Sequence, residues 1–324
     1  MALLFWIFFK FVAVDKKQKL KTIFTMILRK LLSKQTALGV YGFLFLLMMA
    51  CGGGTDKPKE DADTAEASSE VQESLQKVLT DVPEPSELPY QLEATGALFD
   101  TKLPNPHNNV EKYLASNHEA ALNLGIYAAD IGYVSVYEQV QNALDYVKAV
   151  ERLGDKLDIS NAFDPKMQER FKGNLNNIDS LTSIINEALK KSDQYLKDND
   201  RNNIAALIFA GVYIEGLYVA TQLIDTYPDD LLPKDAKDEV LLGLARIVIE
   251  QDKPLVGLLA ALKSMEADDK MKALIADLEA LKEIYAKLNI REKIEKNQGD
   301  FIINDETIKS ITEKVKAIRS GIVS

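Results

Sequence analysis

From residue 70 onward, apolar residues recur every three or four positions, which is the spacing of one face of an α-helix. No run of alternating apolar and polar residues is long enough to indicate a strand. The pattern predicts helices near residues 70–81, 109–133, 136–157, 165–173, 177–198, 201–226, 234–251, 254–265, 268–288 and 304–320. We therefore expect an all-α fold, an irregular antiparallel bundle of about ten helices.

Two helical faces illustrate the pattern. The first consists of Met271, Leu274, Leu278, Leu281, Tyr285 and Leu288, and the second of Ile308, Ile311, Val315, Ile318 and Ile322. Both have the spacing of packing faces in a bundle. Residues 201–230 faintly resemble a tetratricopeptide unit, but no second copy follows at a period of about 34 residues. The sequence therefore predicts a bundle with no regular repeat.

The stretch from Pro83 to Pro106 interrupts this helical pattern. It contains five of the ten prolines, and proline is excluded from helix interiors because it lacks an N–H and its ring clashes with the preceding turn. Apolar residues such as Leu92 and Phe99 lie between the prolines. We therefore expect an extended segment that wraps around the bundle.

Two predicted helices, residues 123–137 and 203–224, are apolar on nearly every side. A helix of this kind belongs at the centre of a bundle rather than at its surface. Both contain small residues at helical spacing, among them Gly125 and Gly211. Such residues allow two helix axes to approach closely.

Each central helix carries one carboxylate, Asp130 in the first and Glu215 in the second. An unpaired buried charge is costly, so each needs partners or a raised pKa. Helical spacing offers Tyr133, Tyr218 and Gln222 as neighbours. Three interpretations remain open at this point: a satisfied hydrogen-bond network that fixes helix register, a polar pocket for a small ligand, and a carboxylate pair for acid–base chemistry.

The N-terminal region has a different composition. Starting from Met26, a short basic stretch precedes an apolar run from Ala37 to Ala50, too short for a stable membrane span but typical of a signal peptide. The run ends in LMMAC, which resembles the lipobox of bacterial lipoproteins, although Met48 stands where leucine is commoner. The resemblance implies cleavage between Ala50 and Cys51 and attachment of acyl chains such as palmitate at Cys51.

These features divide the chain. Residues 1–25 are interpreted as a mis-assigned start or an extra N-terminal segment, and residues 26–50 as the signal peptide. Residues 51–69 are small, polar and charged, which predicts a lipidated, disordered tether. Residues 70–324 form a single all-helical domain in this interpretation. Gly52, where an aspartate would favour retention in the inner membrane of enterobacteria, favours the outer membrane.

Charge and composition exclude several classes of function. The chain has 39 basic and 49 acidic residues; the part after Cys51 keeps 31 basic and 48 acidic residues, a net charge of −17. Such an acidic body repels phosphate backbones, so we expect no nucleic-acid partner. One cysteine and two histidines leave little material for a metal site, and no catalytic motif is found. We expect no cofactor, no metal and no enzymatic activity.

The segments LGIYAADIGYVSVY (124–137) and YIEGLYVATQ (213–222), together with the lipobox, resemble uncharacterised helical envelope lipoproteins of the Bacteroidota. The resemblance implies an envelope location but no activity and no site residues. We expect a non-enzymatic protein, lipid-anchored in the outer membrane, with a structural role or an envelope protein as its partner. The alternative is a small-ligand-binding lipoprotein, accessory to an outer-membrane transporter.

Overall fold

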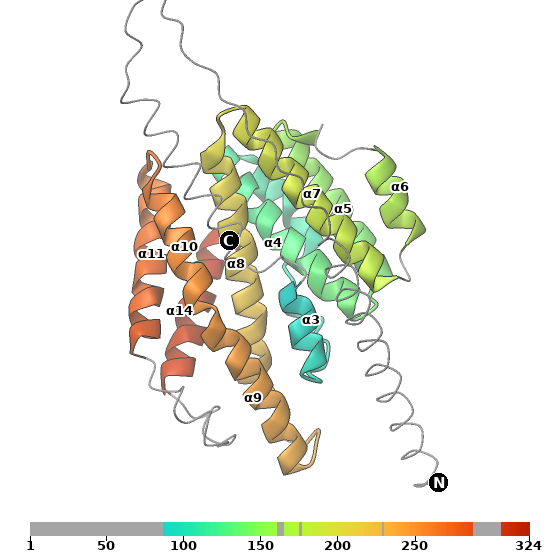
Figure 1. Cartoon of the computed structure of the whole chain (residues 1–324), viewed down its shortest axis with the longest axis vertical. Helices are drawn as coiled ribbons and strands as arrows, with labels where there is room; N and C mark the ends of the chain where they lie inside the picture. The colour runs from blue at the N-terminus through green and yellow to red at the C-terminus, as the bar shows by residue number, and fades with distance from the viewer. Residues whose placement is uncertain (1–86, 161–164, 175–176, 229, 288–305) are drawn as a thin grey trace, which may run out of the picture. The chain divides into compact units, whose positions relative to one another are not determined.

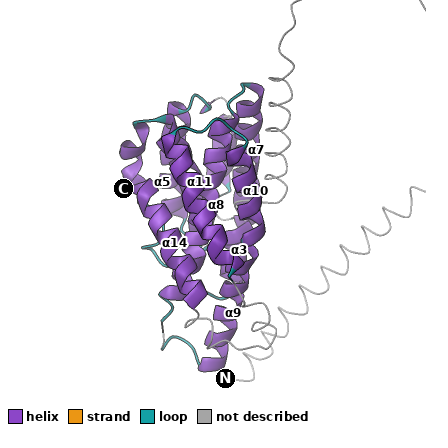
Figure 2. Ribbon diagram, turned by 90° about the vertical axis from the view of Figure 1, so that its left-hand side faces the viewer, coloured by secondary structure: helices purple, strands orange, loops and turns teal. Residues whose placement is uncertain are grey.

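Helices form the whole framework of the described structure. The structure is a computed structural model that describes residues 87–160, 165–174, 177–228, 230–287 and 306–324, which all lie in one compact unit, residues 59–324. This part of the chain holds ten α-helices, one 3₁₀ helix and no strand (Figure 2). The elements are α3 (Glu87–Ala94), the 3₁₀ helix η1 (His107–Leu114), α4 (Asn117–Val136), α5 (Val140–Lys156), α6 (Pro165–Gly173), α7 (Ile178–Asp198), α8 (Asn202–Asp225), α9 (Lys234–Glu250), α10 (Asp252–Lys263), α11 (Asp269–Ala286) and α14 (Glu306–Val323). The all-α prediction is confirmed.

Several predictions concern residues that lie outside the described part of the chain. They are the helix over residues 70–81, the signal peptide, the cleavage site between Ala50 and Cys51, and the tether. The division of the chain into these segments therefore stays a prediction.

The expected helix over 109–133 is wrong in one respect, because the chain forms two elements there, η1 and α4. Ser116 separates them with an extended backbone, and its hydroxyl accepts a hydrogen bond from the N–H of Glu119 at 3.2 Å. Serine followed three residues later by glutamate is a capping-box sequence, which starts a new helix. At its other end α4 continues past the expected boundary at residue 133 to Val136 and stops before Glu138, whose φ is 60°.

The expectation of an extended segment over residues 83–106 is wrong for residues 87–94, which form α3. Pro89 lies in the first turn, where its missing N–H has no helical partner to lose. Gly96 follows the helix with a φ of 85°, a left-handed conformation that favours glycine and ends the helix. Leu88 of α3 fills the space left by Gly216 of α8, where a Cβ would overlap its side chain.

The centre of the fold is the crossing of α4 with α8 (Figure 1). A Cβ on Gly125 would overlap the carbonyl oxygen of Ile208, and one on Gly211 would overlap that of Leu122. The two backbones are therefore in direct contact, which only glycine permits. Among the described helices α8 alone is long and apolar enough to cross a membrane, and 89% of its most apolar window is buried inside the bundle.

Helices α4 and α8 run in the same direction, although neighbours along the chain are mostly antiparallel. Helix α5 turns back along α4, and the Arg201 side chain at the start of α8 donates a hydrogen bond to the carbonyl of Leu157, just after the end of α5, at 2.6 Å. The start of α8 thus lies near the start of α4. Helices α5 and α7 cover α4, while α9, α10 and α14 pack against α8 (Figure 1).

This contact makes a specific prediction about two glycines. We expect Gly211→Ala to lower the free energy of unfolding by about 2–3 kcal/mol or more, because the added methyl group must push two helix backbones apart. Gly321→Ala is the matched control, since no atom lies within 4 Å of a Cβ built there. It should leave stability unchanged or raise it by up to about 0.5–1 kcal/mol through helix propensity. Urea unfolding measures both, and equal effects would contradict the close contact.

Candidate functional site

The two carboxylates of the central helices face each other. Asp130 of α4 and Glu215 of α8 are both fully buried, with an exposed fraction of 0%. Their side chains share a hydrogen bond. Asp130 Oδ2 also accepts a hydrogen bond from the backbone N–H of Asn105 at 3.1 Å. The parallel course of α4 and α8 explains the meeting, because Asp130 and Glu215 lie five and four residues beyond the glycine contact.

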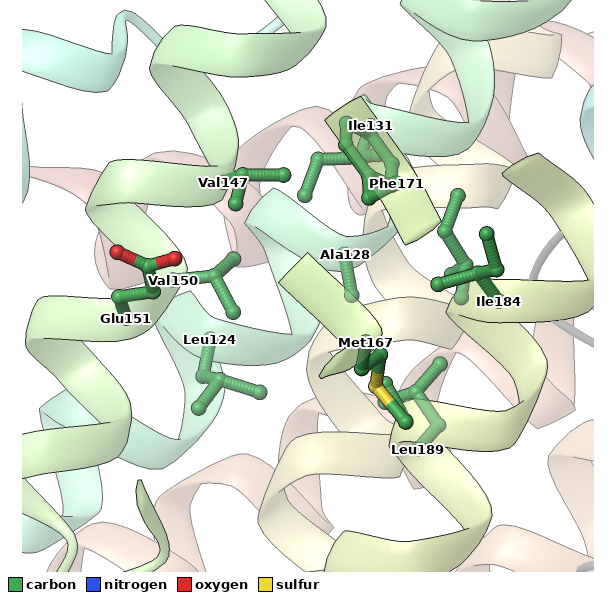
Figure 3. Close-up of a pocket in the computed structure, with 12 residues that line it drawn as sticks. Leu124, Ala128, Ile131, Val147, Val150, Glu151, Met167, Phe171, Ile184 and Leu189 are labelled. Atoms are coloured by element: carbon green, nitrogen blue, oxygen red, sulfur yellow. The ribbon is translucent and has the colours of Figure 1, made fainter. Parts of the chain in front are cut away.

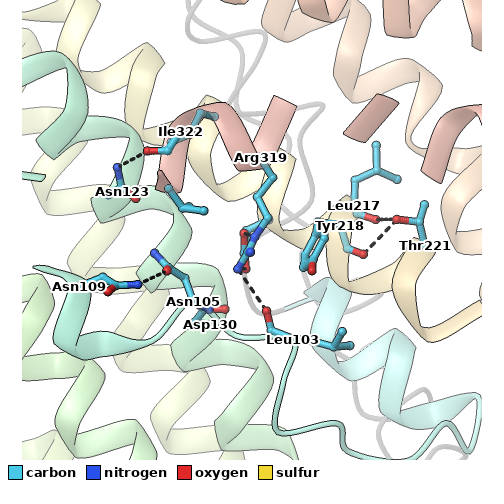
Figure 4. Close-up of polar contacts among 12 residues, drawn as sticks. Leu103, Asn105, Asn109, Asn123, Asp130, Leu217, Tyr218, Thr221, Arg319 and Ile322 are labelled. Atoms are coloured by element: carbon cyan, nitrogen blue, oxygen red, sulfur yellow. Dashed lines mark hydrogen bonds and ion pairs between the residues drawn. The ribbon is translucent and has the colours of Figure 1, made fainter. Parts of the chain in front are cut away.

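Arg319 of α14 closes the site (Figure 4). Its Nε donates to Glu215 Oε2 at 2.8 Å and its Nη2 to Glu215 Oε1 at 2.8 Å, a bidentate ion pair. Nη2 also donates to the carbonyl of Leu103 at 3.1 Å. The guanidinium carbon lies 4.1 Å from the ring centroid of Tyr218, so the cation is also held over an aromatic face.

Burial raises the pKa of Asp130 well above its usual range, and the nearby charge and hydrogen bond of Glu215 raise it further. The positive charge of Arg319 lowers the pKa of Asp130, but by less than burial and Glu215 raise it. The fold therefore favours the protonated form of Asp130 more than water does, because that form avoids a second negative charge beside Glu215.

The pKa of Arg319 is also shifted. Burial alone would lower it, but the charge of Glu215 and the hydrogen bonds to it have the opposite effect, and the net result is a raised pKa. The guanidinium thus keeps its charge throughout the accessible pH range.

The same region anchors the segment Leu103–Pro106, which precedes η1. Side chains from α14, α5 and α4 bind its carbonyls: Leu103 accepts from Arg319, Asn105 from the Tyr146 hydroxyl at 2.8 Å, and Pro106 from the Tyr127 hydroxyl at 3.0 Å. Burial raises the pKa of the Tyr127 and Tyr146 hydroxyls, so both stay protonated donors. The segment is therefore fixed from three helices.

Side chains of η1 and α4 also cap the end of α14. The Tyr113 hydroxyl donates to the carbonyl of Val323 at 3.1 Å, and Asn123 Nδ2 donates to that of Ile322 at 3.3 Å. The last carbonyls of a helix have no partners within the helix, so these bonds satisfy groups that would otherwise be left unpaired. They hold the helix that carries Arg319 in register.

The structure does not bring all five predicted residues together. Tyr218 lies against Arg319, as described. Tyr133 belongs to a neighbouring cluster instead: its hydroxyl accepts from the N–H of Asp100 at 2.9 Å, its ring centroid lies 5.2 Å from that of Phe99, and burial raises its pKa to about 12. Gln222 is buried, but its Nε2 has no hydrogen-bond partner in the described part of the chain and does not reach the carboxylates.

Sequence reasoning missed Arg319. A signal for it was present, because Arg319 lies four residues after Val315 and three before Ile322, on the edge of the apolar face of its helix. A charged residue at such a position requires a buried partner. Asn105, between two prolines, gave no comparable signal.

The arrangement has little capacity for chemistry on a substrate. Both carboxylates are buried and bound to each other, to Arg319 or to backbone, and neither lines either of the two cavities described below. In the described residues no group of three or more His, Cys, Asp or Glu side chains is placed to hold a metal ion. The geometry of Asp130, Glu215 and Arg319 is that of a structural joint between α4, α8 and α14.

Removing the guanidinium of Arg319 should lower the free energy of unfolding. Arg319→Met leaves Glu215 buried without its counter-charge, and we expect a loss of about 3–5 kcal/mol in the free energy of unfolding. The double variant Glu215→Met/Arg319→Met should be more stable than Arg319→Met, because it removes both charges. Lys270→Met, which breaks an exposed pair with Glu119, should cost about 1 kcal/mol or less. Urea unfolding that gave the two single variants equal costs would contradict the assignment.

The raised pKa of Asp130 predicts a pH dependence of stability. A group whose pKa is higher in the folded state loses its stabilising effect as pH rises from its unfolded to its folded pKa, by about 1.4 kcal/mol per pH unit. Asp130→Asn keeps a donor toward Glu215 and removes the titration, so its stability relative to the wild type should rise with pH above about pH 4. Parallel profiles in urea unfolding between pH 4 and 8 would show that the fold does not raise the pKa of Asp130.

Asp145→Asn is the control of opposite sign. Hydrogen bonds from Lys148 and Gln141 lower the pKa of the exposed Asp145 carboxylate. The stabilising effect of this group is therefore present above its unfolded pKa and is lost as pH falls. Its replacement should change stability little and should not reproduce the rise expected for Asp130→Asn.

Comparisons with protein-family models, curated proteins and solved structures find no match to this chain. The arguments for function therefore rest on the residues and contacts of this chain. Among the contacts described above, those of Asp130, Glu215 and Arg319 have the most completely defined geometry.

Proposed function

We propose that this protein is a lipid-anchored lipoprotein of the bacterial envelope whose helical body is non-enzymatic and has a structural or protein-interaction role. The non-enzymatic role is supported by one observation: the carboxylates of the central site are already bound and are enclosed by helices. Glu215 is bound on both oxygens by Arg319, and Asp130 is bound by Glu215 and by the backbone of Asn105. A general acid or base must reach a substrate, and these groups are enclosed by helices.

Two facts support the anchor. The sequence places a single cysteine directly after an apolar run that ends in Ala50, in a lipobox-like context. The apolar character of α8, the one described helix that could span a bilayer by length, is explained by its burial in the bundle. Two or more acyl chains give stable membrane attachment, whereas one gives only marginal binding. Cys51 is therefore the proposed attachment point, with the outer membrane as the proposed location.

The alternative function, binding of a small ligand as an accessory to an outer-membrane transporter, is favoured by a different observation. An apolar cavity of about 80 Å³ lies between α4, α5, α6 and α7, away from the ion pair. A stable complex with another envelope protein would support the structural role. A ligand that fills this cavity would support the alternative.

The anchor predicts a defined chemical change at Cys51. In cells fed an alkyne-tagged fatty acid, the wild-type protein should take up the tag and begin at residue 51, as read by mass spectrometry of its N-terminal peptide. Cys51→Ala should lose the tag and keep residues 26–50, because lipidation precedes cleavage in this class. Thr55→Ala, a nearby substitution in the tether, should be tagged normally. A mature wild-type protein with a free Cys51 thiol would refute the anchor.

A further inference from the structure

The apolar cavity has four walls, each from a different helix (Figure 3). Eleven of its twelve lining residues are apolar. Leu124, Ala128 and Ile131 of α4 form one wall, Val147 and Val150 of α5 the second, Met167 and Phe171 of α6 the third, and Ile184, Ile185, Ala188 and Leu189 of α7 the fourth. The twelfth residue is Glu151 of α5.

The space exists because two walls carry alanines. Ala128 and Ala188 project only a methyl group each, where a leucine on either helix would occupy the cavity. Apolar cavities stay dry, and an empty cavity lowers stability in proportion to its volume. Native interiors are otherwise packed to the density of organic crystals. An unfilled apolar space at this position is therefore a site that a ligand could fill.

The cavity reaches the surface on one side. Val147, Glu151 and Ala188 are half-buried, whereas Leu124, Ile131 and Phe171 are buried, so the depth of the cavity is apolar and its opening carries the carboxylate. Glu151 has no hydrogen bond or ion pair in the described part of the chain, and its nearest opposite charges are Lys172 and Lys148. Burial raises the pKa of Glu151.

Size limits the occupant. The volume of about 80 Å³ is roughly half that of an apolar protein cavity that binds benzene, which is about 150 Å³. A ring does not fit, but the end of a linear chain does. The unpartnered carboxylate at the opening selects a head group that can donate a hydrogen bond to it.

We propose that the cavity between α4, α5, α6 and α7 binds a short alkyl chain whose head group, an ammonium or a hydroxyl, donates a hydrogen bond to Glu151. The proposal names the ligand class for the alternative function and rests on that function. It does not depend on the anchor, because Cys51→Ala changes fatty-acid tagging and leaves the cavity unaltered.

A larger cavity, of about 290 Å³, lies between α4, α11 and α14, but its charged groups are already paired. Glu119 pairs with Lys270 at 2.7 Å and Asp277 with Lys314 at 2.7 Å. His118 also lines this cavity, but burial lowers the pKa of its imidazole, so it offers no unpaired charge that would select a ligand at neutral pH. The smaller cavity is therefore the better-defined site.

Photolabelling tests the proposal on the purified full chain. The probes are butylamine, butanol and butanoate, each with a diazirine near the far end of the chain, and the labelled peptides are mapped by mass spectrometry. We expect butylamine and butanol to label peptides from α6 and α7, and butanoate to label them at least fivefold less. Labelling spread over the chain with no enrichment at these helices, or butanoate labelling as strong as that by butylamine, would overturn the proposal.

Two kinds of variant locate the binding. Ala128→Leu fills the cavity and should reduce labelling of α6 and α7 by butylamine at least fivefold without lowering the melting temperature. Ala260→Leu makes the same change at an exposed position of α10 and should have no effect. Should Ala128→Leu fail to fold, Ala188→Leu fills the space from the opposite wall. Unchanged labelling in a folded, cavity-filled variant would overturn the proposal.

Glu151→Gln tests the head group separately. Loss of the carboxylate should reduce the difference between butylamine and butanoate to less than twofold, while labelling by butanol persists. A preference for butylamine that survived in this variant would show that Glu151 does not select the head group.

Discussion

The direct backbone contact between α4 and α8 is the constraint on which the rest of the structure depends. Gly125 and Gly211 bring the axes so close that carbonyl oxygens lie where a side chain would otherwise begin. Because the two helices run in the same direction, residues a similar distance beyond the contact lie at the same level. Asp130 and Glu215 are five and four residues beyond it, so the crossing itself places the two carboxyl groups together.

Two adjacent buried carboxylates each disfavour the charged form of the other, and the fold limits this conflict in two ways. The pKa of Asp130 is raised by burial and by Glu215, and Glu215 is paired with Arg319. The cation comes from the last helix, 104 residues further along the chain than Glu215. Tyr113 connects the segment Leu103–Pro106 to the end of α14, because its hydroxyl bonds both the Asn105 side chain and the carbonyl of Val323. The ion pair therefore ties together parts of the chain that are distant in sequence, and a buried pair of this kind is better understood as fixing an arrangement than as adding stability.

The sequence predicted the features that depend on local pattern. Helices with a wide apolar face, such as the one bearing Met271, Leu278 and Tyr285, bury those residues in the structure. The central position of α4 and α8 followed from their composition. Spacing along one helix could not reveal contacts across helices. Tyr133 is one turn from Asp130 and yet binds Asp100, because the loop after α3 passes over that side of α4. Helix α3 was missed because its proline lies in the first turn, where it is harmless, and because its terminating glycine was not weighed.

The polar cluster and the apolar cavity are lined by adjacent faces of α4. Asn123, Tyr127 and Asp130 form the stripe with polar contacts, while Leu124, Ala128 and Ile131, each one residue later, line the apolar cavity. Successive residues on a helix point about 100° apart, so the two stripes look toward different neighbours. The apolar composition of α4 on nearly every side thus has two causes, the contact with α8 and α14 on one stripe and the enclosure of the cavity by α5, α6 and α7 on the other. A side chain enlarged at Ala128 projects away from Asp130, which means that the cavity can be altered without disturbing the ion pair that holds the bundle together.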